Sequence, residues 1–267
     1  MAVANIEYFS HALQRTVNFH LILPNDVMSY YKENNKHYER PMKTLMLLHG
    51  YFGSSTEWLY KSEISELAAR YNLCVILPSG ENSFYTDGTS SGRQYGKFIG
   101  EELINYVQDT FNLSKKLEDT FIGGFSMGGF GALLTALEYN QTYDKSFVLS
   151  AALITETIEN MEETHQAMAN YDYYKLVFGD LKKVKDSRYH PQYLIDEIKA
   201  TNGKMPELFV ACGSEDWLIE ASRDFVTSLE EQSIPLIYRE EKGGHDFGFW
   251  NRMIEPAIKW CLGDNDS

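Results

Sequence analysis

The stretch Gly124-Phe125-Ser126-Met127-Gly128 joins two segments of different character. Residues 120–122 form an apolar run typical of a buried strand, and residues 130–139 have helical spacing. A serine in a tight turn between strand and helix has a strained backbone, and side chains two positions away on either side would collide across that turn. The two glycines meet this requirement. The stretch therefore predicts that Ser126 projects from a strand-to-helix turn and can act as a nucleophile.

Similar apolar runs recur along the chain and alternate with segments of helical spacing. The runs expected to form strands are residues 44–49, 73–77, 120–122, 147–150, 208–212 and 234–238. The segments expected to form helices are residues 64–71, 98–111, 130–139, 219–229 and 250–260. Continuous apolar strands that alternate with helices are typical of a mostly parallel sheet with helices on both faces, so we expect an α/β fold.

Two regions depart from this alternation. Extended segments at residues 6–10 and 16–23 flank a polar stretch around Gln14-Arg15, which predicts an antiparallel hairpin at a sheet edge. Residues 153–204 break the rhythm and are rich in aromatic and charged residues, so we expect a cap-like insertion over the carboxyl edge of the sheet. Its aromatic side chains either line a substrate pocket or form a small core of their own. The 267 residues show no other break in composition, which predicts a single domain.

The composition narrows the range of partners. The formal net charge is -14, and a surface this acidic repels phosphate backbones and anionic lipids. Lys182, Lys183 and Lys185 are too few to supply a basic patch, so we expect no nucleic-acid or membrane partner. A small-molecule substrate of little charge fits this surface better. The composition does not decide between a monomer and a homo-oligomer.

The N-terminus lacks the basic start and apolar stretch of a signal peptide, and we expect a cytoplasmic protein. The odd count of three cysteines, Cys74, Cys212 and Cys261, predicts buried free thiols rather than disulfides. The Cys and His spacings do not resemble a zinc site, and we expect neither a metal nor a cofactor.

A serine nucleophile needs a base, because its hydroxyl is almost wholly protonated at neutral pH. His245 is the one histidine that follows the last predicted strand, in a glycine-bearing loop before the final helix. The orienting acid is expected after the preceding strand, where Glu215 and Asp216 compete. Asp216 is preferred because its shorter side chain loses less entropy in holding an imidazole, whereas Glu215 could cap the following helix. Asp246 adjoins His245 only in sequence, and we interpret it as structural.

Negative charge on a substrate oxygen must be met by two donors. Met127, directly after the serine, would supply one backbone N–H from the start of the helix. The other should come from the loop after His49, where Tyr51 is preferred and Phe52 is the alternative. A glycine-rich loop after a strand could instead bind phosphate, but the sequence has no G-x-x-x-x-G-K motif and the net charge of -14 disfavours an anion.

Five motifs in this order resemble the putative-esterase branch of the α/β-hydrolases, over about residues 40–262. They are Leu47-Leu48-His49-Gly50, Ser83-Phe84-Tyr85-Thr86-Asp87, Gly123-Gly124-Phe125-Ser126-Met127-Gly128-Gly129, Cys212-Gly213-Ser214-Glu215-Asp216, and Gly243-Gly244-His245-Asp246-Phe247 with Trp250. Within this branch the chain is most similar to the short intracellular tributyrin esterases of Gram-positive bacteria. It lacks the cysteine-containing oxyanion loop of the S-formylglutathione hydrolases, which makes that substrate a weaker expectation.

The resemblance implies an α/β-hydrolase fold and a triad of Ser126, Asp216 and His245. The expected activity is that of a serine carboxylesterase, which hydrolyses acetyl to butyryl esters through an acyl-enzyme. Four aromatic residues near predicted loops could form an apolar wall for substrate or belong to the core: Phe52, Trp58, Tyr85 and Trp217. A carbohydrate O-deacetylase or feruloyl-type esterase would share the triad. A binding domain that kept the scaffold without catalysis is a further alternative.

Overall fold

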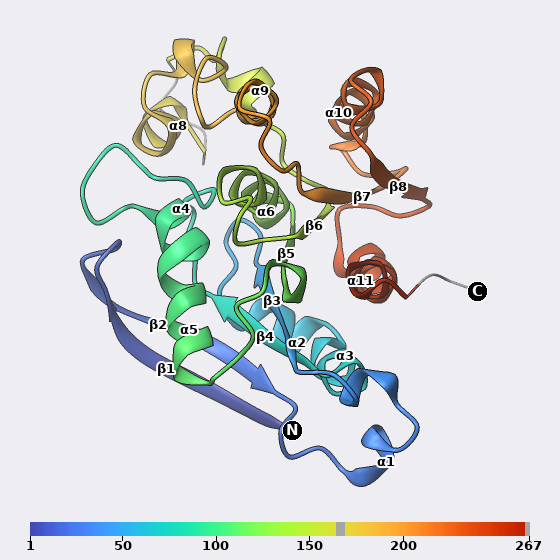
Figure 1. Cartoon of the computed structure of the whole chain (residues 1–267). Coiled ribbons are helices and arrows are strands. Elements are labelled where there is room, and N and C mark those ends of the chain that lie inside the picture. Colours follow the sequence, from blue (N-terminus) through green and yellow to red (C-terminus); the bar gives the residue numbers. More distant parts are fainter. Residues whose placement is uncertain (164–168, 265–267) are drawn as a thin grey trace.

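The computed structural model describes residues 1–163 and 169–264, and within them the strands form one eight-stranded sheet in the order β1-β2-β4-β3-β5-β6-β7-β8 (Figure 1). From β4 to β8 all neighbouring strands are parallel, whereas β1 pairs antiparallel with β2, and β2 with β4. The strands are β1 Ala2–Ser10, β2 Arg15–Leu23, β3 Lys43–Leu48, β4 Leu73–Pro78, β5 Thr120–Phe125, β6 Lys145–Leu149, β7 Glu207–Gly213 and β8 Leu236–Glu241.

Helices cover both faces of this sheet, each over a separate apolar core (Figure 1). One face carries α2 Glu57–Lys61, α3 Ile64–Tyr71 and α11 Phe247–Leu262. The other carries α4 Tyr95–Lys97, the π-helical turn η2 Phe98–Glu102, α5 Leu103–Thr110, α6 Met127–Glu138, α9 Pro191–Ala200 and α10 Ile219–Glu231. The remaining short elements are α1 Ser29–Lys32, η1 Lys36–Tyr38, η3 Leu117–Asp119, α7 Thr155–Ile158, α8 Tyr171–Phe178 and η4 Leu181–Lys183. The expected α/β fold with an N-terminal hairpin is confirmed.

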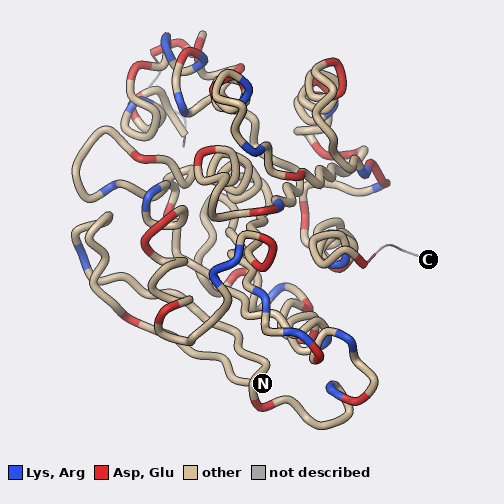
Figure 2. The backbone as a smooth tube through the Cα atoms, viewed as in Figure 1, with Lys and Arg blue, Asp and Glu red and all other residues tan. Residues whose placement is uncertain are grey.

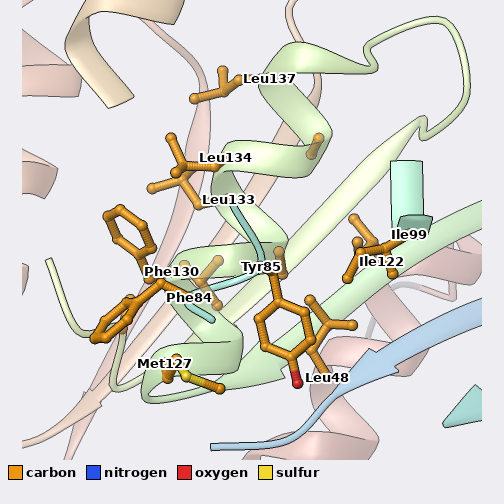
Figure 3. Close-up of a cluster of buried hydrophobic side chains, with 14 of the residues drawn as sticks. Leu48, Phe84, Tyr85, Ile99, Ile122, Met127, Phe130, Leu133, Leu134 and Leu137 are labelled. Carbon is orange, nitrogen blue, oxygen red and sulfur yellow. The ribbon is translucent and has the colours of Figure 1, made fainter. Parts of the chain in front are cut away.

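Helix α6 is the most deeply buried helix of the site region. Every residue from Met127 to Leu137 is buried, and Figure 3 shows Phe130, Leu133 and Leu137 projecting from it among the side chains of the larger core. Full burial of one such side chain is worth about 1.5–3 kcal/mol. The helix that begins just after Ser126 is therefore held firmly against the sheet.

Several element boundaries differ from the sequence expectation, and three of them have a clear local cause. Helix α6 begins at Met127 rather than at residue 130, because Gly128 and Gly129 belong to the helix without contributing to its apolar pattern. Helix α11 begins at Phe247, since the Asp246 side chain accepts the N–H of Phe249 at 3.1 Å and caps the helix. Strand β8 begins after Pro235, which has no N–H to give to a neighbouring strand.

The segment expected to be an insertion, residues 153–204, connects β6 to β7 and contains α7, α8 and α9; residues 164–168 lie outside the described part. Helix α9 packs beside α6 (Figure 1). Phe178 of α8 is 2% exposed and its ring lies 5.4 Å from Phe84 and 6.1 Å from Phe130. This aromatic side chain therefore joins the main core and neither lines a pocket nor forms a separate core.

Two further features of the described residues concern the cysteines and the helices. Cys74, Cys212 and Cys261 are buried free thiols, as predicted, and burial raises the pKa of each of them. Among the helices that the structure describes, none combines the length and the apolar character needed to cross a membrane.

Candidate active site

Ser126 occupies the turn between β5 and α6 with φ 54° and ψ -122°. An L-residue in such a conformation costs on the order of 1–3 kcal/mol and persists only where its surroundings fix it. The Ser126 N–H donates to the carbonyl of Leu149 at 2.9 Å, and its own carbonyl accepts the N–H groups of Phe130 and Ala152, each at 3.0 Å. These bonds to β6, to α6 and to the loop after β6 hold the strained residue in place.

The glycines on either side of Ser126 are required by close backbone contacts. A Cβ atom on Gly124 would lie 2.5 Å from the carbonyl oxygen of Gly128. One on Gly128 would lie 2.5 Å from the carbonyl oxygen of His49 and 2.6 Å from that of Leu48. Contacts this short with backbone atoms force the chain apart. The steric reason predicted for both glycines is confirmed, and the start of α6 lies directly against the end of β3.

Three side chains from distant parts of the chain form a continuous hydrogen-bonded row. Ser126 Oγ lies 2.9 Å from Nε2 of His245, which comes from the loop between β8 and α11. Nδ1 of His245 lies 2.9 Å from Oδ2 and 3.1 Å from Oδ1 of Asp216, which follows β7. Ser126 is 9% exposed and Asp216 is 2% exposed, so the row runs inward from the surface.

The environment of Asp216 favours its charged form. Burial by itself raises the pKa of this carboxyl, but the hydrogen bond from His245 and that from the backbone N–H of Leu218, at 2.9 Å, outweigh the effect. The Ser150 hydroxyl acts in the same direction, and the pKa of Asp216 is lowered overall. A carboxylate here keeps the proton of His245 on Nδ1, which leaves Nε2 free to accept the Ser126 proton.

The neighbouring carboxylates have other partners. The Glu215 side chain is 60% exposed and lies 3.9 Å from Nζ of Lys242, on the outside of the loop. Asp246 caps α11, in keeping with the structural role expected for it. Of the two acids left open by the sequence, only Asp216 contacts His245 in the described residues.

Trp250 and Ser150 pack against the hydrogen-bonded row, a role that the sequence analysis did not assign to either residue. The indole of Trp250 lies edge-on to His245, with ring centres 5.1 Å apart, and stacks on Phe125 at 4.0 Å. Its Nε1 donates to Ser150 Oγ at 3.1 Å. The available signals were Trp250, which belongs to the motif around His245, and a polar residue, Ser150, directly after β6.

The two backbone N–H groups expected to meet charge on a substrate oxygen are those of Met127 and Tyr51. Within the described residues, neither the N–H of Met127 nor that of Tyr51 has a hydrogen-bond acceptor. The alternative donor, the N–H of Phe52, is engaged by Oδ1 of Asn82 at 2.9 Å. The backbone thus leaves Tyr51 rather than Phe52 available in the loop after β3.

The four aromatic residues expected near substrate divide into two pairs. Phe52 is 66% exposed and its ring lies 4.4 Å from Tyr51, while Trp217 is 71% exposed and 5.2 Å from His245. Trp58 and Tyr85 are each 1% exposed and belong to the core, which corrects the expectation that they contact substrate. Each donates a hydrogen bond to a backbone carbonyl at the end of β3: Trp58 Nε1 to that of Leu48 at 2.9 Å, and Tyr85 Oη to that of His49 at 3.0 Å.

The described residues contain no group of three or more His, Cys, Asp or Glu side chains placed to hold a metal ion.

Comparison with known proteins identifies the family. A model described as putative esterase matches residues 10–260. An acetyl esterase of Caldicellulosiruptor saccharolyticus is 40% identical over 261 residues, which cover 97% of this chain and 98% of that protein. The S-formylglutathione hydrolase of Bos taurus is 25% identical over 243 residues, 80% of each chain.

Solved structures agree with this result. Fluorophosphonate-binding serine hydrolase F of Staphylococcus aureus has a TM-score of 0.84 at 30% identity and covers 99% of both chains. An S-formylglutathione hydrolase of Staphylococcus aureus has a TM-score of 0.81 at 30% identity, over 98% of this chain and 100% of that one. The fold is therefore that of the α/β-hydrolases, as the motifs implied. The chain belongs to the putative esterase family and is a serine hydrolase.

Proposed function

We propose that this protein is a serine carboxylesterase that hydrolyses short-chain esters, from acetyl to butyryl, through an acyl-enzyme on Ser126. The observation that carries the proposal is the row of contacts from Ser126 Oγ to His245 Nε2 and from His245 Nδ1 to Asp216, each 2.9 Å at its shortest. Such a row gives the hydroxyl a base within reach and gives the base a fixed tautomer.

In the first half of the reaction, Ser126 Oγ attacks the ester carbonyl while His245 Nε2 takes its proton. The carbonyl oxygen becomes negative and accepts hydrogen bonds from the N–H groups of Tyr51 and Met127, which are free in the described residues. His245 then gives the proton to the leaving alcohol, and the acyl group stays on Ser126. Asp216 keeps its charge throughout and stabilises the imidazolium.

In the second half, a water molecule takes the place of the alcohol. His245 Nε2 removes one proton from this water, the resulting hydroxide attacks the acyl carbonyl, and the same two N–H groups meet the oxygen. The tetrahedral adduct collapses, the Ser126 oxygen takes the proton back from His245, and the carboxylic acid leaves. No cofactor is consumed.

Short acyl groups and a small neutral ester are supported by three features. The relative with 40% identity is an acetyl esterase. Phe52 and Trp217 place exposed aromatic surface beside Tyr51 and His245. The net charge of -14, with basic positions scattered among acidic ones in Figure 2, disfavours anionic partners such as nucleic acids and membrane surfaces. A carbohydrate O-deacetylase or feruloyl-type esterase would use the same residues.

The test compares wild type with Ser126→Ala on p-nitrophenyl esters of two to eight carbons. The same series includes an acetylated sugar, a feruloyl ester and S-formylglutathione, each ranked by kcat/KM. We expect the best values for acetyl to butyryl esters and a loss of at least about 10⁴-fold in Ser126→Ala. Ser65→Ala on the surface helix α3 is the matched control. Near-normal turnover by Ser126→Ala contradicts the proposal, whereas a preference for a sugar or feruloyl ester changes only its substrate.

A further inference from the structure

The loop that carries Tyr51 is strained and needs outside support. We define the oxyanion loop as residues 49–53, directly after β3. Phe52 has φ 65°, in the left-handed region that a bulky L-residue rarely adopts, and the N–H of Gly53 closes a turn on Gly50 O at 3.0 Å. Because one peptide unit separates the free N–H of Tyr51 from this strained residue, the direction of that N–H depends on what fixes Phe52.

The support comes from residues 80–85, after β4, which we call the clamp segment. Gly80 N–H donates to Nε2 of His49 at 2.8 Å, and Tyr85 Oη donates to the carbonyl of His49 at 3.0 Å. Nδ1 of His49 contacts Gly50 O at 2.8 Å, so this buried imidazole carries its proton on Nδ1 and stays neutral. These bonds fix the base of the oxyanion loop.

Asn82 of the clamp segment fixes the tip of the oxyanion loop. The side-chain carbonyl Oδ1 of Asn82 accepts the N–H of Phe52 at 2.9 Å. This bond occupies the competing donor of the loop and holds Phe52 in its left-handed conformation. It spans thirty residues of sequence and is the one side-chain bond to the backbone N–H groups of the oxyanion loop in the described residues.

The insertion holds Asn82 in turn. Tyr173 of α8 donates its hydroxyl to the backbone carbonyl of Asn82 at 2.6 Å. The ring of Tyr173 also packs edge-on against Tyr51, with ring centres 5.6 Å apart at 85°. A continuous set of contacts therefore runs from α8 through Asn82 to the loop beside Ser126.

We propose that Asn82 is a positioning residue for the oxyanion hole: by holding the N–H of Phe52 it directs the N–H of Tyr51 toward Ser126, and Tyr173 of the insertion keeps Asn82 in place. This inference rests on the proposed function, because it concerns the same site. It assigns the insertion a part in stabilising the transition state.

The experiment measures two quantities in each variant. One is kcat/KM for p-nitrophenyl acetate, with kcat and KM separated. The other is inhibition by a short-chain trifluoromethyl ketone. Ser126 Oγ adds to the carbonyl carbon of this ketone, His245 accepts the serine proton, and the carbonyl oxygen becomes an alkoxide in the oxyanion hole. Loss of one oxyanion donor costs about 10²–10³-fold in kcat. A misdirected donor costs less, so we expect Asn82→Ala to lower kcat about 10- to 100-fold with KM within about twofold.

The ketone separates positioning from a merely structural role. Its inhibition constant in Asn82→Ala is expected to rise by the same factor by which kcat/KM falls, because both report stabilisation of the oxyanion. Asn82→Asp keeps the size and the acceptor oxygen for the N–H of Phe52, so we expect it to melt like wild type and to bind the ketone more tightly than Asn82→Ala does. Ketone binding within twofold of wild type in Asn82→Ala overturns the proposal.

Tyr173→Phe tests the role of the insertion. Its loss is expected to be smaller, about three- to tenfold, and to appear again in kcat and in ketone binding. Tyr189→Phe is the matched control, because Tyr189 of the same insertion also donates its hydroxyl to a backbone carbonyl at 2.6 Å, that of Asp87, outside the clamp segment. Equal effects of Tyr173→Phe and Tyr189→Phe contradict the assigned path.

Failure of the two hypotheses gives different results. A wild-type protein that hydrolyses no ester, or whose hydrolysis survives Ser126→Ala, contradicts the proposed function and this inference together. An active wild type that depends on Ser126, with an Asn82→Ala variant that binds the ketone as wild type does, contradicts only the inference.

Discussion

Replacing Asp216 by asparagine probes the part of the site that sets the proton positions. Asp216 Oδ1 accepts the Leu218 N–H at 2.9 Å, so the carbonyl of an asparagine would keep that bond. Its NH₂ group would then take the place of Oδ2, which lies 2.9 Å from Nδ1 of His245. An NH₂ group donates, and it can only face an unprotonated Nδ1. The proton of the imidazole would move to Nε2, where it blocks acceptance of the Ser126 proton.

The size of the effect follows from this forced tautomer. In Ser-His-Asp sites the acid-to-amide change lowers kcat about 10⁴-fold, which corresponds to about 5 kcal/mol of transition-state stabilisation. We expect a loss of about 10³- to 10⁴-fold here, because Oδ1 also lies within 3.1 Å of Nδ1 and both carboxylate oxygens contribute. KM should change by less than about threefold, since Asp216 is 2% exposed and does not face substrate.

The assay is steady-state hydrolysis of p-nitrophenyl acetate from pH 6 to 10, with thermal melting of each variant. Glu215→Gln is the control, because it makes the same change one residue away on an exposed side chain. It should retain activity within about twofold of wild type. A loss of less than tenfold in Asp216→Asn, or an equal loss in Glu215→Gln, refutes the role derived for Asp216.

Three further predictions use the same protein. Because the pKa of Asp216 is lowered in the folded state, its charge stabilises the fold above the unfolded pKa near 3.9, and this contribution disappears as the pH falls through the folded pKa. The difference in free energy of unfolding between wild type and Asp216→Asn should therefore shrink from pH 6 to pH 3 in urea titrations, and a difference that grows would contradict this prediction. Gly128→Ala would place Cβ 2.5 Å from His49 O, so we expect a loss of about 1–3 kcal/mol in unfolding free energy together with activity, while Gly203→Ala, whose nearest contact is 3.4 Å, should melt close to wild type. Trp217→Ala removes a side chain that is 71% exposed, so stability should change by less than about 0.5 kcal/mol while KM rises more for butyryl than for acetyl esters; a large drop in melting temperature instead would mark Trp217 as structural.

Local chemistry made much of this fold readable from the sequence. The parallel strands are continuous apolar runs, and helix α3 begins and ends at the expected residues, Ile64 and Tyr71. Ser126, Asp216 and His245 each follow a strand in the predicted chain order, and the structure brings them together. The parallel direction of these strands explains this, because the carboxyl ends of parallel strands meet at one edge of the sheet.

What the sequence left undetermined depends on contacts between distant residues. Trp58 and Tyr85 occupy loop-adjacent positions, as Phe52 and Trp217 do, yet the first pair is buried and the second exposed. Trp58 and Tyr85 each donate a hydrogen bond to a carbonyl at the end of β3. Residue type alone does not show these partners. Likewise, the N–H of Phe52 is engaged by Asn82, thirty residues away, and this partner cannot be read from the loop sequence.

A crystal structure of the wild-type protein after reaction with a short-chain alkyl phosphonate tests the nucleophile and both oxyanion donors at once. We expect phosphorus bonded to Ser126 Oγ, with the phosphoryl oxygen about 3 Å from the backbone nitrogens of Tyr51 and Met127 and with His245 still paired to Asp216. Phosphorus on another residue, or a phosphoryl oxygen that points away from both nitrogens, would contradict this expectation.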